Sequence, residues 1–169
     1  MNILLTKPLA AYLKENPETD VPIGENPNFN WLGHLIEQDG QKYAIFINQP
    51  SLFTIIVKAE PETQIVADLK DQLSEHLKSL QMDSKAVKAY LKDFSEVNFY
   101  RLKDKKLLGK MNAITARVRV EIKKIAGISA PIRFATTEVN SARGKKGKGC
   151  QCPTCLLMKM FELNSGQRG

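Results

Sequence analysis

The sequence has no long hydrophobic run and no recognisable export signal. No apolar stretch in its 169 residues approaches the roughly 20 residues that a transmembrane helix needs. Residues 1–5 are apolar, but they are too few for a signal peptide and no charged segment precedes them. We therefore expect a cytoplasmic protein with no membrane partner.

Cysteine and histidine are scarce, and no catalytic motif is readable. The chain has three cysteines within six residues and only two histidines, His34 and His76. These residues do not form a disulfide framework or a nucleophile–base pair of known spacing. The glycine-rich run at residues 144–149 lacks the spacing of a phosphate-binding loop. We therefore predict that the protein is not an enzyme and that both histidines are structural.

Acidic residues are scarce in the second part of the chain only. Residues 1–100 carry nine Lys/Arg and fourteen Asp/Glu, a net charge of −5, whereas residues 101–169 carry sixteen Lys/Arg and four Asp/Glu, a net charge of +12. A basic region of this kind is typical of proteins that bind a phosphate-rich partner. It is equally compatible with self-association or with docking on an acidic protein.

The clearest helical pattern lies at residues 104–125. Apolar residues recur there at steps of three and four, which places them on one side of a helix. Asp104 is suited to begin the helix and Gly127 to end it. Four cations fall within roughly 40° of one another beside this apolar stripe. They are Lys106, Lys110, Arg117 and Lys124. The alternative interpretation is a core helix whose charges only keep it soluble.

The remaining patterns predict an α+β fold. Three strands are expected at residues 31–37, 42–48 and 52–57, with Asp39-Gly40 as a hairpin turn. Further helices are expected at residues 62–80 and 83–94, and further short strands at residues 2–6, 97–102 and 129–137. We predict an antiparallel sheet of about four to five strands packed with three to four helices. We expect a core domain at residues 1–127 and a basic, cysteine-containing C-terminal extension at residues 128–169.

The cysteines of this extension have the spacing of metal ligands. They are Cys150, Cys152 and Cys155. Two thiolates separated by two residues can bind one zinc ion, and Pro153 favours the turn between them. A structural zinc site needs four ligands, so His34, His76 or a second subunit would have to complete it. The alternative is three reduced cysteines without metal.

The extension also carries a second group of cations and an apolar end. The cations are Arg143, Lys145, Lys146 and Lys148. Their glycine-rich surroundings suit nonspecific contacts with phosphates. Six apolar residues follow Cys155, and burying them favours docking on the core or dimerisation.

Short motifs in residues 1 to about 125 resemble a family of small bacterial proteins that is known only as a domain of unknown function. The family's Trp-His-Ala-Asn-Leu strand corresponds to Trp31-Leu32-Gly33-His34-Leu35, where the first and last residues agree. Its Arg-Met-Asn-Lys-Ala run corresponds to Lys110-Met111-Asn112-Ala113, with Lys for Arg and one residue fewer. Some members look like an appendage on a larger plasmid-type protein. The resemblance implies an α+β fold and brings no activity.

Two function classes follow from these observations. The first is a small protein that binds nucleic acid through the basic helix face and the basic extension, with contacts to phosphates. The second is a protein-interaction or inhibitor module of plasmid or phage origin, which would dock by charge complementarity or form a homodimer.

Overall fold

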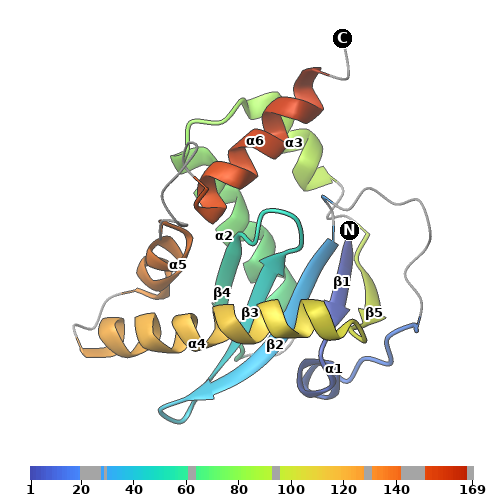
Figure 1. Cartoon of the computed structure of the whole chain (residues 1–169), viewed down its shortest axis with the longest axis vertical. Coiled ribbons are helices and arrows are strands. Elements are labelled where there is room, and N and C mark those ends of the chain that lie inside the picture. Colours follow the sequence, from blue (N-terminus) through green and yellow to red (C-terminus); the bar gives the residue numbers. More distant parts are fainter. Residues whose placement is uncertain are drawn as a thin grey trace.

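The computed structural model describes most of the chain and confirms the α+β class. The described residues are 1–19, 28, 30–60, 64–92, 96–127, 131–141 and 151–166. Within them the chain forms a five-stranded sheet and six helices, where three to four helices were expected. Figure 1 shows the sheet between helices on both of its faces, with α4 lying across the front.

The element bounds agree closely with the hydrophobic patterns in the first 127 residues. The strands are β1 (Asn2–Leu5), β2 (Asn30–Gln38), β3 (Gln41–Asn48), β4 (Thr54–Lys58) and β5 (Asn98–Arg101). The helices are α1 (Lys7–Leu13), α2 (Ile65–Ser79), α3 (Ser84–Lys92), α4 (Lys105–Gly127), α5 (Ile132–Ser141) and α6 (Pro153–Gly166).

The sheet is mixed, so the prediction of an antiparallel sheet is wrong. Its order is β4-β3-β2-β1-β5. The meander β2-β3-β4 is antiparallel as expected, but β1 runs parallel to both β2 and β5. Parallel neighbours need long crossover connections. The chain provides them, because α1 lies between β1 and β2, and two helices precede β5.

Two local signals have the expected geometry. Asp39 and Gly40 both have positive φ, 53° and 76°, as a two-residue hairpin turn between β2 and β3 requires. At the start of α4, Asp104 Oδ1 accepts hydrogen bonds from the backbone N–H groups of Lys106 (2.7 Å) and Leu107 (3.2 Å). Asp104 therefore caps the helix as predicted.

Both faces of the sheet are buried, each beneath its own set of helices. One face carries Trp31 and Phe46, both fully buried, and is covered by α1, α2, α3 and α6. The opposite face carries Leu32 and Ile45 and is covered by α4 and α5. Trp31 and Phe46 are therefore core residues rather than exposed stacking surfaces. The structure has a layer of helices on each side of one sheet.

The described residues of the segment 129–137, which are residues 131–137, do not form the predicted strand. The described part of this segment begins α5, which packs against α4 and the edge strand β4. From α5, the Asn140 side chain accepts a hydrogen bond from Thr54 N–H (2.8 Å) and donates one to Thr54 C=O (2.6 Å). The Thr136 hydroxyl accepts from Ile56 N–H at 3.4 Å. These two side chains satisfy backbone groups that a further strand would otherwise have paired.

The apolar end of the extension packs on the core. Leu157 of α6 is fully buried and Phe161 is 6% exposed. The Phe161 ring lies 4.9 Å from the Tyr90 ring, centroid to centroid. Of the two outcomes that the apolar sequence favoured, docking on the core is therefore present in this structure.

Candidate functional site

The exposed side of α4 is the most strongly charged feature of the described residues. The helix has 23 residues, so it is about 34 Å long at 1.5 Å per residue. Met111, Val118 and Ile122 point into the sheet and are at most 1% exposed. The charged residues of the helix are seven Lys/Arg and one Glu. The sequence concentrates cations in this helix. Because the apolar side of α4 packs on the sheet, the cations face away from it.

The four cations that the sequence analysis selected lie along one side of α4. We call this side the first flank: Lys106, Lys110, Arg117 and Lys124. Three of these residues are exposed and Arg117 is half-buried. Lys124 forms an ion pair with Glu121 at 2.8 Å, yet its side chain remains 63% exposed. An exposed pair of this kind is weak, so it leaves the Lys124 charge accessible to a stronger anion.

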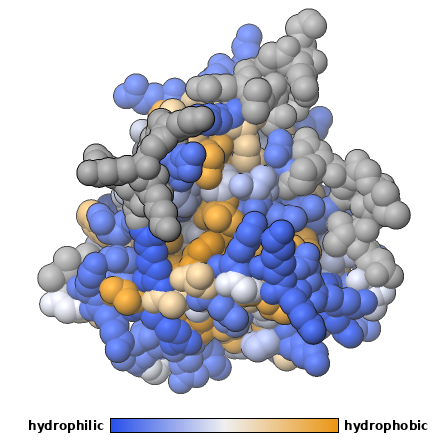
Figure 2. Space-filling view, in the orientation of Figure 1, coloured by the Kyte–Doolittle hydropathy of each residue, from blue (hydrophilic) through white to orange (hydrophobic). Residues whose placement is uncertain are grey.

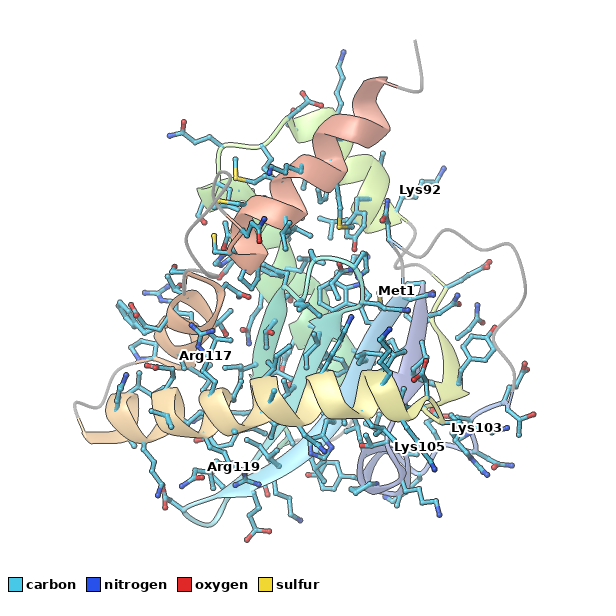
Figure 3. All side chains as sticks on the ribbon, viewed as in Figure 1. Met1, Lys92, Lys103, Lys105, Arg117 and Arg119 are labelled. Carbon is cyan, nitrogen blue, oxygen red and sulfur yellow. The ribbon has the colours of Figure 1, made fainter. Side chains whose placement is uncertain are left out.

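The sequence analysis missed a second line of cations on the other side of the helix. This second flank consists of Lys105, Arg119 and Lys123. Lys105 and Lys123 share one angular position on the helix, about 40° from that of Arg119. Figure 3 shows Arg117 on the α5 side of α4 and Arg119 on the side of the β2–β3 hairpin. Applying the same angular count to every cation, rather than to the densest group, would have found this flank.

Arg119 is held in place by the hairpin that it overlies. Its Nη1 donates hydrogen bonds to the backbone oxygen of Glu37 at 2.7 Å and to Gln38 Oε1 at 3.3 Å. Neither partner is a carboxylate, so these two hydrogen bonds do not neutralise the positive charge with a counter-ion. Nearby on β2, the ring of His34 is half-buried and contacts Thr6 Oγ1 at 3.1 Å. Burial, and then the charge of Arg119, lower the pKa of His34 below its ordinary value.

Small and apolar residues separate the two flanks. This crest consists of Gly109, Ala113, Ala116 and Val120. All four are exposed, and Val120 is 52% exposed. Figure 2 shows hydrophilic surface along α4, broken by apolar patches. Because the crest side chains are short, a flat or grooved partner can approach the helix closely enough to reach both flanks.

The second predicted group of cations lies outside the described residues. Arg143, Lys145, Lys146 and Lys148 belong to this group. Their proposed contact with phosphates therefore stays a prediction.

The structure describes two of the three predicted metal ligands. Cys152 precedes the first turn of α6 and is 6% exposed, and Cys155 is half-buried. The N–H of Cys155 donates to Cys152 Sγ at 3.4 Å. Cys150 lies outside the described residues. Among the described residues no group of three His, Cys, Asp or Glu side chains is placed to hold a metal ion. Zinc binding by the three cysteines stays a prediction.

The fold and the site define a small α+β protein that presents a basic helix on one face of a mixed sheet. The chain belongs to the family described as Domain of unknown function (DUF6933), whose model matches residues 2–154. The match confirms the resemblance and extends it past residue 125, through α5 and as far as the first two residues of α6. No curated protein matches the sequence. In the part of the chain that the structure describes, no helix is long and apolar enough to cross a membrane.

Proposed function

We propose that this protein associates with nucleic acid through the exposed side of α4. One observation carries the proposal: seven cations and one carboxylate occupy a helix whose buried side is entirely uncharged. The first and second flanks lie on either side of a low crest, so one phosphate backbone, or two across a groove, can meet both. The major groove of B-DNA is about 12 Å wide and admits an α-helix.

The proposed contacts are with phosphates and not with base edges. Lysine dominates both flanks, and its ammonium group acts as a mobile point charge rather than a geometric reader of bases. Such contacts release counterions from the polymer and give binding that weakens steeply with salt. The basic residues of the extension, Arg143 to Lys148, would add to this term without adding sequence selectivity.

A triple substitution on the first flank tests the proposal. Lys106, Lys110 and Arg117 are changed to Ala, and binding to fluorescently labelled DNA and RNA is measured at about 50 mM salt, where phosphate contacts are strongest. We expect the affinity to fall about tenfold or more. The matched control removes three exposed lysines of α3, which are Lys85, Lys88 and Lys92.

The control has the same net charge as the test variant but a different distribution. Figure 3 places Lys92 far from α4. The control should therefore bind nearly as tightly as the unchanged protein. If both triple variants lose affinity equally, the protein attracts nucleic acid only through its total charge. If the unchanged protein binds neither DNA nor RNA, the proposal is wrong.

The second function class is a protein-interaction module, and the crest is the observation that favours it. Val120 is 52% exposed amid cations, a composition that also suits docking on an acidic protein surface. Val120→Asp places a charge in the middle of that surface. The second class is supported if the unchanged protein captures a protein partner and does not bind nucleic acid. A partner that binds through the crest should not bind the Val120→Asp variant.

A further inference from the structure

A cavity of about 310 Å³ lies between the second half of α2 and the first half of α5. We call it the α2–α5 pocket. It is distinct from the exposed side of α4, because its lining residues come from α2 and α5 and none comes from α4. Pockets for small molecules are roughly 300–1,000 Å³. Its volume therefore suits one small ring system and not a large ligand.

The lining of the pocket combines a flat apolar surface with unused polar groups. The Phe134 ring is 51% exposed, an unusual state for an aromatic side chain in this chain. Gln72 Oε1 is completely buried, and no described group donates a hydrogen bond to it. A buried acceptor of this kind destabilises the folded state unless a ligand or water supplies a donor. Gln72 also lines the pocket, so a rotation of its side chain would bring this acceptor, which requires an N–H or O–H group, beside the surface for stacking.

Charge in the pocket is divided between two side chains. The Arg133 guanidinium lies 5.9 Å from the centroid of the Phe134 ring, within the range of a cation–π contact. Glu75 lines the opposite, α2 side. His76 follows Glu75 on α2 and also lines the pocket. Burial lowers the pKa of His76, so its ring is neutral near pH 7. A bound group thus meets one cation, one anion and a neutral ring that can donate or accept.

We propose that the α2–α5 pocket takes one unpaired base of single-stranded nucleic acid. The base stacks on the Phe134 ring, its edge exchanges hydrogen bonds with the Gln72 carboxamide, and Arg133 contacts the neighbouring phosphate. Nucleobases carry N–H groups and a π-face, which matches the two unmet features of the pocket. This inference rests on the proposed function, since the flanks of α4 supply most of the binding energy.

The position of α5 connects the pocket to the basic helix. Ala135 and Val139 of α5 lie in the same buried cluster as Val118 of α4. Figure 3 shows Arg117 on the side of α4 that faces α5. In this proposal, a strand whose phosphates follow the first flank continues over α5 to Phe134. A duplex cannot make this contact, because its bases are stacked and paired.

The test compares a single strand with a hairpin duplex that contains the same sequence. The unchanged protein should bind the single strand more tightly. Phe134→Ala should weaken binding of the single strand about fivefold to a hundredfold, the effect of losing one stacked base, and leave binding of the duplex unchanged. Phe134→Trp keeps an aromatic surface and should retain most of the affinity. Because half of the ring is exposed, the folded state should tolerate both changes, and thermal unfolding verifies this.

Each outcome bears on the pocket separately from the basic helix. If single strand and duplex bind the unchanged protein equally, or if Phe134→Ala weakens both alike, the pocket does not hold a base, although the proposed function stands. If nothing binds, the proposed function and this inference fail together. Titration with free nucleoside monophosphates is the last arm. If these nucleotides bind as tightly as the single strand, and if Phe134→Ala weakens their binding equally, the pocket is a small-molecule site and the proposal is wrong.

Discussion

The carboxamide of Asn140 replaces a peptide group at the free edge of the sheet. It accepts from Thr54 N–H and donates to Thr54 C=O, as a neighbouring strand would, and it also donates to Thr136 C=O at 2.9 Å. Asn140 is fully buried, so water cannot take its place. Edge strands with unpaired backbone groups are sites of aggregation. One side chain therefore satisfies and protects the beginning of β4.

Asn140→Ala should destabilise the protein strongly. It leaves the N–H and C=O of Thr54 buried without partners, which costs about 3 kcal/mol. Thr136→Val is the comparison, because it removes only the longer 3.4 Å contact with Ile56 N–H and should cost less. The measurement is the urea unfolding midpoint of each variant. If the two variants lose the same stability, the contacts of Asn140 with Thr54 contribute no more than the contact of Thr136 with Ile56.

The histidines make the stability of the folded state depend on pH. Burial lowers the pKa of His76 below 6.5, and burial with Arg119 does the same for His34. Well above pH 6.5 both rings are neutral in the folded and unfolded states, so pH has no effect through them. Below it, the unfolded chain takes up protons first. Stability is therefore lost as the pH falls from about 6.5 through the pKa values of the folded state.

His76→Gln should reduce this loss. Glutamine has a similar polar character but does not titrate, so the difference in unfolding free energy between pH 7 and about pH 5 becomes smaller. His34→Gln should reduce it independently, because the two rings lie on opposite faces of the sheet. Urea unfolding at the two pH values measures both. An unchanged pH dependence in each variant would show that other groups produce it.

At the scale of helices and strands, periodicity decided how much could be predicted. The apolar steps from Leu107 to Ile125 determine both the existence of α4 and the side that it buries, so the first flank was readable from the sequence. The Asp39-Gly40 turn was readable for a similar reason, since few residues accept its backbone angles. Such features depend on neighbours within one turn or one hairpin.

The features that could not be predicted depend on contacts between distant segments. In α5, Ile132, Thr136 and Thr137 are β-branched, which locally favours a strand. The edge of β4 selects a helix instead, because its contacts are with Thr54 and Ile56, which are only two residues apart. Residues 136 and 140 lie about 6 Å apart in a helix and can reach both, whereas in a strand they would lie about 13 Å apart. The parallel pairing of β1 and the α2–α5 pocket have the same origin. Neither leaves a pattern within a single stretch of sequence.

The docking of α6 yields a prediction at this scale. Phe161→Ala removes the ring that contacts Tyr90 and leaves a cavity beneath α6. In the described residues α6 has few neighbouring elements, so we expect local undocking rather than general unfolding. Hydrogen exchange should show faster exchange of α6 amides, with unchanged protection in β2 and β3. Equal loss of protection in the sheet would show that α6 unfolds only together with the core.

At the scale of the whole molecule, the two faces of the sheet have different roles. The face beneath α1, α2, α3 and α6 holds the larger buried cluster, which includes Trp31 and Phe53. The face beneath α4 and α5 carries the concentrated positive charge on its outer surface. The edges of the sheet offer little to a partner strand, because α5 covers β4 and Glu18 bridges to Tyr100 of β5. Helical surfaces therefore remain for recognition.

The salt dependence of binding tests whether α4 acts as a single electrostatic surface. The logarithm of the binding constant should fall linearly with the logarithm of salt concentration. Removing Lys106, Lys110 and Arg117 should reduce the slope by about two to three units, because each lost phosphate contact removes about 0.7–0.9. Removing Lys85, Lys88 and Lys92 of α3 should leave the slope unchanged, since α3 packs on the opposite face of the sheet from α4. The slope complements the comparison of affinities, because it counts the phosphate contacts that are lost. A slope that the first-flank variant does not change would mean that nucleic acid, if bound, lies on another surface, and the crest would then be free for a protein partner.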